Sequence, residues 1–150
     1  LALLGFVSEV VGVNTGYVFG SYHYGHSLGY KFLGVPLLIS LNWALLITRG
    51  IIISQSLHTN PTLKAIFSAL IVSGLDLLME QMAPHLDYWY FERGIAGIHN
   101  SFGWFVISFS ASLLLQKHLA KGNKKISVAI IALQFFFFGL IYLVEHFHLI

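Results

Sequence analysis

Four long apolar segments constrain this chain more than any other feature of its sequence. They cover about residues 35–54, 63–84, 98–116 and 126–148, and a helix needs roughly 20 apolar residues to cross a bilayer. A further apolar run at residues 1–13 is shorter than a full span. Only 9% of the residues are Asp, Glu, Lys or Arg, against roughly 25% in a typical soluble domain. The sequence therefore predicts an all-α, polytopic transmembrane bundle of about five hydrophobic helices.

Proline positions support these segment boundaries. Residues 60–62 read Asn-Pro-Thr, a good N-terminal signal for a helix, and Pro84 closes the same segment. Pro36 stands at the start of another segment, where its missing N–H costs nothing. We interpret residues 1–150 as a single integral-membrane domain. Because the chain opens with Leu1 in a short apolar run, we expect further helices upstream.

Two long connections, at residues 14–34 and 85–97, are rich in aromatic residues and glycine. Interfacial anchoring by Tyr and Trp is the simpler interpretation, although a long glycine-rich loop more often lines or covers a site. The connection at residues 117–125 holds four lysines, so the positive-inside rule predicts that it is cytoplasmic. Helix alternation then places both aromatic loops together on the opposite face.

Three acidic residues, Glu9, Asp76 and Glu80, are expected in the half of the bundle that faces the aromatic loops. Asp76 and Glu80 are four residues apart and therefore share one helix face. Alternation of the helices brings further polar and indole side chains to the same half. These are Asn42, Trp43, Asn100, Trp104, Glu145 and His146.

An ionised carboxyl at the centre of a membrane helix costs roughly 2.5 kcal/mol or more, so such residues are usually functional. The alternative is a structural carboxyl that is satisfied by hydrogen bonds between helices. Two carboxyls that share a site do not both ionise easily, which leaves a neutral acid able to donate a proton. Glu145 lies near a helix end, where it can simply reach the interface.

Several other classes of chemistry lack their signatures. The chain has no cysteine, no HExxH, no DDxxD pair, no Walker loop and no GxGxxG motif. Its histidines do not cluster as a di-iron membrane hydroxylase requires. We therefore predict no metal site, no cofactor and no nucleic-acid partner. The basic residues of the cytoplasmic loop are too few and too local for nucleic acid: Lys117, Lys121, Lys124 and Lys125.

Two blocks of sequence carry a resemblance to a known family. Residues 9–24 read EVVGVNTGYVFGSYHY and are followed by Leu-Gly at 28–29 and Gly-Val-Pro at 34–36. The second block is looser, with its matching residues at Asp76, Glu80, Trp89, Asn100 and Trp104. Together the blocks span about two thirds of the chain. The pattern resembles the carotenoid biosynthesis membrane family that contains the carotenoid 1,2-hydratases and the bisanhydrobacterioruberin hydratases.

The resemblance implies a reaction that needs no cofactor. A hydro-lyase of this family adds water across a terminal isoprenoid double bond of an acyclic or monocyclic carotenoid, giving a tertiary alcohol. The setting would be a bacterial or archaeal cytoplasmic membrane. A neutral carboxyl would protonate the alkene, and a carboxylate would deprotonate the attacking water. We expect Asp76 or Glu80 as the proton donor and Glu9 as the base for water.

Further residues of the two blocks are expected to bind the substrate. Aromatic faces stabilise a cation, and amide or hydroxyl groups orient water. The first group contains Tyr22, Tyr24, Trp43, Trp89 and Trp104, and the second contains Asn14, Thr15 and Asn100. An internal repeat supports one shared site, because Glu9, Tyr22, Tyr24 and Trp43 match Glu80, Trp89, Phe91 and Trp104 in order.

Three alternatives remain open at the level of sequence. A carotenoid cyclase would use the same protonation and let an internal alkene quench the cation. A membrane transporter or lipid-binding subunit would use the carboxyls to bind protons or cations. A structural subunit would carry them for helix packing alone.

Overall fold

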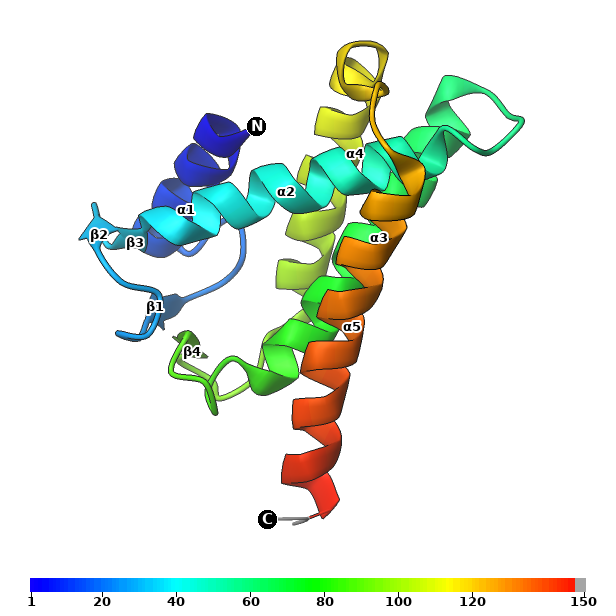
Figure 1. Cartoon of the computed structure of the whole chain (residues 1–150). Coiled ribbons are helices and arrows are strands. Elements are labelled where there is room, and N and C mark those ends of the chain that lie inside the picture. Colours follow the sequence, from blue (N-terminus) through cyan, green and yellow to red (C-terminus); the bar gives the residue numbers. More distant parts are fainter. Residues whose placement is uncertain (148–150) are drawn as a thin grey trace.

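Five helices within residues 1–147, the part of the chain that the computed structural model describes, confirm the all-α prediction (Figure 1). The four longer ones are each long and apolar enough to cross a membrane. The first is an apolar helix of 14 residues, shorter than a span. Their bounds are α1 (Ala2–Thr15), α2 (Leu37–Ser54), α3 (Pro61–Met82), α4 (Ile98–Leu119) and α5 (Lys124–Phe147).

The helix boundaries lie within three residues of the predicted ones. The predicted connection at residues 117–125 is too long, because Lys117 belongs to the last turn of α4 and Lys124 and Lys125 to the first turn of α5. Asn60 caps α3 by accepting a hydrogen bond from the Leu63 N–H at 2.9 Å. The second helix begins one residue after Pro36, because residues 35–36 are extended and paired in a short strand. The predicted end of the fifth segment, His148, lies outside the described residues.

Four short strands, which the sequence did not predict, lie in the two aromatic loops and at the start of the predicted segment 35–54. β1 (Tyr22–Tyr24) pairs antiparallel with β4 (Trp89–Phe91), and β2 (Lys31–Phe32) pairs with β3 (Val35–Pro36). Strands of two or three residues are too short to show an alternating pattern. The β1–β4 ribbon joins the two loops directly, which confirms that both lie on one side of the bundle.

Close helix contacts in the bundle depend on small residues, as is usual where helices pack in lipid. The Ser68 hydroxyl on α3 lies 2.9 Å from the Ser112 hydroxyl on α4. Gly50 on α2 lets that helix approach the same point, since a Cβ there would lie 2.6 Å from Ser68 Oγ and 3.1 Å from its carbonyl oxygen. As Figure 1 shows, α2 thereby runs across α3 and α4 instead of alongside them.

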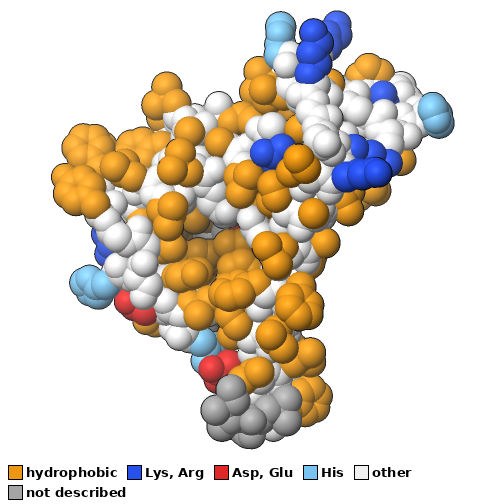
Figure 2. Space-filling view, in the orientation of Figure 1, with side chains coloured by type: hydrophobic (Ala, Val, Ile, Leu, Met, Phe, Trp, Pro, Cys, Tyr) orange, Lys and Arg blue, Asp and Glu red, His pale blue; other side chains and the backbone are white. Residues whose placement is uncertain are grey.

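The outer surface is apolar over the four longer helices. Leu70, Leu114, Leu133 and Phe136 are each more than half exposed, and Figure 2 shows hydrophobic side chains over most of the visible face. Lys and Arg gather mainly around the turns that join α2 to α3 and α4 to α5 (Figure 2). This distribution fits an integral, multi-pass membrane protein.

Two glycine substitutions test whether close packing sets the position of α2. We expect Gly50→Ala to lower the free energy of unfolding by about 1–3 kcal/mol, because the new methyl group overpacks the contact with Ser68. Gly74→Ala on α3 is the matched control: its nearest neighbour would be 3.9 Å away, and it should add about 0.5–1 kcal/mol through helix propensity. Unfolding in detergent micelles, followed by Trp fluorescence, measures both, and equal effects would contradict the packing argument.

Candidate active site

Glu9 is the centre of the first group of polar side chains. It projects from α1 and is 3% exposed. The Tyr22 hydroxyl and the Tyr24 hydroxyl, the latter at 2.7 Å, donate to Oε2, and Trp43 Nε1 donates to Oε1 at 2.8 Å. Tyr22, Tyr24 and Trp43 are its only hydrogen-bond partners among the described residues, and three donors suit a carboxylate, which only accepts hydrogen bonds.

Strand geometry explains why both tyrosines reach the same carboxylate. Side chains alternate along a strand, so Tyr22 and Tyr24 point inward from β1 while His23 between them is exposed. Burial raises the pKa of both phenols, and the nearby Glu9 carboxylate raises it further. The hydroxyls therefore stay protonated and remain donors. Gly5 makes room for the third donor, since a Cβ there would lie 2.5 Å from Trp43 Cβ.

Asp76, Glu80 and Asn100 form the second group. The Asn100 amide donates to Asp76 Oδ2 at 3.1 Å and to Glu80 Oε1 at 2.8 Å, so one side chain bridges both carboxyls. Trp89 Nε1 donates to Glu80 Oε2 at 3.2 Å. Asp76 is fully buried, and its Oδ1 has no hydrogen-bond partner among the described residues. Because two carboxyls this close do not readily ionise together, the group can hold a proton.

Aromatic rings join the two groups. Trp43 and Trp104 stack with centroids 4.0 Å apart and planes 6° apart. Phe19 packs against both indoles, at 6.1 Å and 6.4 Å between centroids. The result is an aromatic wall between α1, α2 and α4.

The two halves are related by an approximate two-fold arrangement that matches the internal repeat. Tyr22 lies opposite Phe91 and Tyr24 opposite Trp89 in the β1–β4 ribbon, and the matching Trp side chains of α2 and α4 stack on one another. The first half carries the additional β2–β3 ribbon between β1 and α2. This insertion accounts for the longer spacing between its aromatic pair and its tryptophan.

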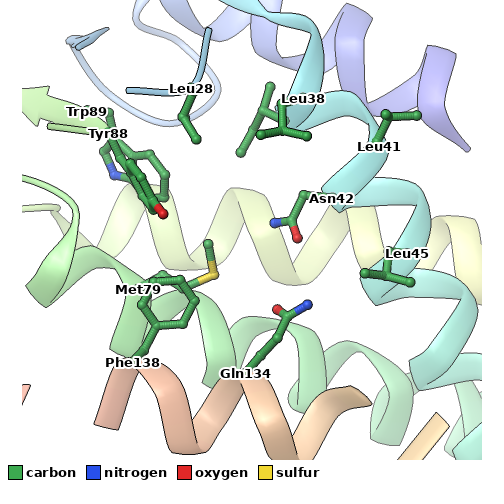
Figure 3. Close-up of a pocket in the computed structure, with 11 residues that line it drawn as sticks. Leu28, Leu38, Leu41, Asn42, Leu45, Met79, Tyr88, Trp89, Gln134 and Phe138 are labelled. Atoms are coloured by element: carbon green, nitrogen blue, oxygen red, sulfur yellow. The ribbon is translucent and has the colours of Figure 1, made fainter. Parts of the chain in front are cut away.

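Two neighbouring cavities share part of their lining, and carboxyl groups line the smaller one. A small one of about 10 Å³, roughly the space that a single water needs, is lined by Glu9, Glu80, Asn100 and aromatic side chains. A larger, mainly apolar one of about 470 Å³ lies between α2, α5 and the two loops, as Figures 2 and 3 show. Ile39 and Trp89 line both cavities and so form the boundary between them.

Most of the predicted site residues come together here. Asn14 and Thr15 do not: their side chains are exposed and bond to carbonyls one turn back in α1, those of Val10 and Val11. Glu145 is also outside, 48% exposed and 3.5 Å from His85. The residues brought together are Glu9, Tyr22, Tyr24, Trp43, Asp76, Glu80, Trp89, Asn100 and Trp104.

Residues that the sequence did not single out complete the cavities. Ile39, Met79 and Phe138 line the larger cavity, but they are apolar, so the sequence does not distinguish them from the other apolar residues of their helices. Gln134 could have been identified from the sequence, because a polar residue inside an apolar membrane segment is usually functional, which is the rule that identified Asp76. Within residues 1–147 no group of three or more His, Asp or Glu side chains could hold a metal ion.

The loops that carry β1 and β4 are held together by Asp87. Its Oδ2 accepts the His26 backbone N–H at 2.8 Å, and its Oδ1 accepts the Tyr90 hydroxyl at 2.9 Å. These hydrogen bonds, with the His26 amide as the main cause, lower the pKa of Asp87 below its usual value. Gly25 permits the contact, since a Cβ there would lie 2.2 Å from Asp87 oxygens.

Fold and site together define a helical membrane protein that encloses a carboxyl cluster beside an apolar cavity. The family model for carotenoid biosynthesis protein matches residues 1–149. The chain therefore belongs to the carotenoid biosynthesis protein family and has a role in carotenoid biosynthesis. Comparison with curated proteins and with solved structures finds no match.

Asp87 makes the stability of the loop contact dependent on pH. Because its pKa is lower in the folded protein, its contribution is present above the unfolded value of about 3.9 and is lost as the pH falls through the folded value. We expect Asp87→Asn to be less stable than the wild type at pH 6, with the difference shrinking towards pH 3. Urea unfolding in micelles measures this difference. Glu92→Gln, an exposed carboxyl in the same loop, is the control, and a difference independent of pH would contradict the assignment.

Proposed function

We propose that the protein is a carotenoid hydratase, a cofactor-independent hydro-lyase that adds water to a terminal isoprenoid double bond. The observation that carries this proposal is the water-sized cavity between Glu9 and Glu80, placed beside an apolar cavity. A hydratase needs those parts together: a place for the alkene, a place for one water, and carboxyls for the two proton transfers.

The apolar cavity suits the end of an acyclic or monocyclic carotenoid. Its volume of about 470 Å³ lies within the usual range for small-molecule sites, roughly 300–1,000 Å³. The rest of the polyene is too long for this space and would extend into lipid along α2 and α5. The reacting end would approach the carboxyls past Ile39 and Trp89, which line both cavities.

Glu80 is the better placed of the two candidate proton donors. It lines the small cavity, whereas Asp76 lies behind Asn100 and has no exposed surface. Protonation of the less substituted alkene carbon leaves the positive charge on the tertiary carbon. Because Asp76 and Glu80 do not readily carry two negative charges at once, the pair holds a proton, which Glu80 can deliver to the alkene.

Glu9 then acts as the base. Its three donors hold it as a carboxylate on the far side of the water-sized cavity. The water oxygen bonds to the tertiary carbon, one water proton passes to Glu9, and return of that proton to Glu80 restores the starting state. Net consumption is one water per double bond. The faces of Trp89, Trp104 and Phe91, which line the same cavity, stabilise the cation.

The proposal includes a bacterial or archaeal cytoplasmic membrane as the location, with residues 117–125 in the cytoplasm. The basic loop lies next to the α2–α3 turn, because Gln116 Nε2 donates to the Pro61 carbonyl at 3.1 Å. Their Lys and Arg side chains therefore share one end of the bundle, as the positive-inside rule requires of a cytoplasmic face.

Pigment analysis tests the reaction. In bacteria that accumulate lycopene or γ-carotene, expression of the protein should give a carotenoid heavier by one water, identified by mass spectrometry. Glu80→Gln, Asp76→Asn and Glu9→Gln should each reduce the yield by about 10²–10⁴-fold, the usual contribution of a proton-transfer group. Glu145→Gln replaces an exposed glutamate outside the site and should leave the yield unchanged.

Other outcomes of the pigment analysis would favour other functions. A product of unchanged mass and new retention time would identify a cyclase. Unchanged pigment with well-expressed protein would contradict the enzyme and favour a transporter or lipid-binding subunit. Full activity in all three carboxyl variants would contradict the assignment of the site.

Cysteine labelling tests the orientation. The chain has no cysteine, so single variants need no background removal. We expect Arg93→Cys, in an aromatic loop, to react with a membrane-impermeant maleimide in intact cells. Lys121→Cys, in the basic loop, should react only after permeabilisation, and the reverse pattern would invert the proposed orientation.

A further inference from the structure

The larger cavity contains two amide side chains that the hydration mechanism does not use. Asn42 projects into it from α2 and Gln134 from α5, and Figure 3 shows their amide groups pointing towards one another across the space. The other lining residues are mainly Leu, Ile, Met and aromatic side chains. A cavity for a pure hydrocarbon has no need of either amide.

Each amide presents an unsatisfied group. Asn42 Nδ2, a donor, and Gln134 Oε1, an acceptor, are buried atoms without a hydrogen-bond partner among the described residues. A buried polar atom without a partner is costly and uncommon in native structures. The two amide side chains line one cavity from different helices, one with an unpartnered donor and the other with an unpartnered acceptor, and together they suit a ligand group that both accepts and donates.

We propose that Asn42 and Gln134 form a subsite for the hydroxyl group of an isoprenoid alcohol. An alcohol oxygen accepts from Asn42 Nδ2 and its O–H donates to Gln134 Oε1, while its carbon chain meets the apolar lining. A ketone would satisfy only the donor. A lone water held by these two amides would leave an O–H and a lone pair against an apolar wall, with fewer than the roughly three hydrogen bonds that a buried water typically makes.

The position of the subsite links it to the proposed reaction, on which this inference rests. Asn42 is three residues from Ile39 along α2, about one helical turn of roughly 5 Å. Ile39 borders the small cavity with the carboxyls. The subsite therefore holds an oxygen close to the reacting end of the chain. That oxygen has two possible sources: the tertiary alcohol that hydration produces, or a hydroxyl that the substrate already carries beside its double bond.

Binding measurements test the subsite without requiring turnover. The ligands are lycopene and 1-hydroxy-1,2-dihydrolycopene, which share the same conjugated chain and differ by one water. Quenching of Trp fluorescence in detergent micelles reports binding, because Trp89 lines the cavity. The wild type should bind the alcohol about tenfold more tightly than the hydrocarbon, as expected for hydrogen bonds that complete buried partners.

Replacing the amides by leucine should remove this preference. Asn42→Leu and Gln134→Leu keep the approximate side-chain size, and the double variant should bind both ligands equally, with lycopene bound at least as tightly as before. Gln81→Leu makes the same change at an exposed position on α3 and should retain the tenfold preference. It also controls for detergent effects.

The preference for the alcohol decides the inference. Equal binding of the two ligands by the wild type, binding of neither, or a preference that survives in the double variant would each overturn it. If the Asn42 and Gln134 amides hydrogen-bond to each other instead of to a ligand, the wild type should bind the two ligands equally. The Glu80→Gln variant separates the two proposals, because it should keep the binding preference even though it cannot transfer the proton. Preference without hydration in pigment analysis would refute the hydratase and leave the subsite intact.

Turnover identifies the source of the hydroxyl. If the product alcohol occupies the subsite, the double variant should release hydrated lycopene with a reduced yield. If the substrate already carries the hydroxyl beside its double bond, the double variant should hydrate lycopene, which has no hydroxyl, with the same yield as the wild type. These two turnover results distinguish the sources once the wild type is known to prefer the alcohol.

Discussion

The hydrogen bonding of Glu9 is the constraint on which the rest of the site depends. A carboxylate that is 3% exposed in a helix packed within a membrane bundle needs donors from the protein. Glu9 obtains them from β1 and from α2, elements 13 to 34 residues away in sequence. Satisfying one side chain therefore fixes the path of the first aromatic loop and the approach of α2 to α1. Gly5 is needed because that approach leaves no room for a Cβ beside Trp43.

The approximate two-fold arrangement explains how one bundle holds two kinds of carboxyl. Four residues before Glu9 stands Gly5, whereas four residues before Glu80 stands Asp76. Four residues before Trp43 stands Ile39, and the matching position before Trp104 is Asn100. The first half thus has a single carboxylate with its donors, and the second half has a carboxyl pair that shares one amide. These two positions therefore give the two halves of the bundle different carboxyl environments.

Much of the site could be predicted because its signals are local. Charged residues are rare in the apolar segments, so Glu9, Asp76 and Glu80 stood out, and helix alternation placed them in the same half of the bundle. Asn14 and Thr15 were expected beside them on the strength of the motif alone. Their side chains are exposed and donate to backbone carbonyls, Asn14 to those of Val10 and Leu33 and Thr15 to that of Val11. Gln134 was overlooked, although its polarity within an apolar segment was visible in the sequence.

The sequence by itself determined the class of the protein, the number of helices and the side of the bundle on which the acids lie. Hydropathy, proline positions and the alternating direction of successive helices can all be read from short stretches of sequence. Only the tertiary structure decided which donor serves which carboxyl, that β1 pairs with β4, and that a water-sized cavity adjoins an apolar one. The physical reason is that hydrogen bonds and cavities depend on distances between segments far apart in the chain, which loop paths and side-chain packing set together.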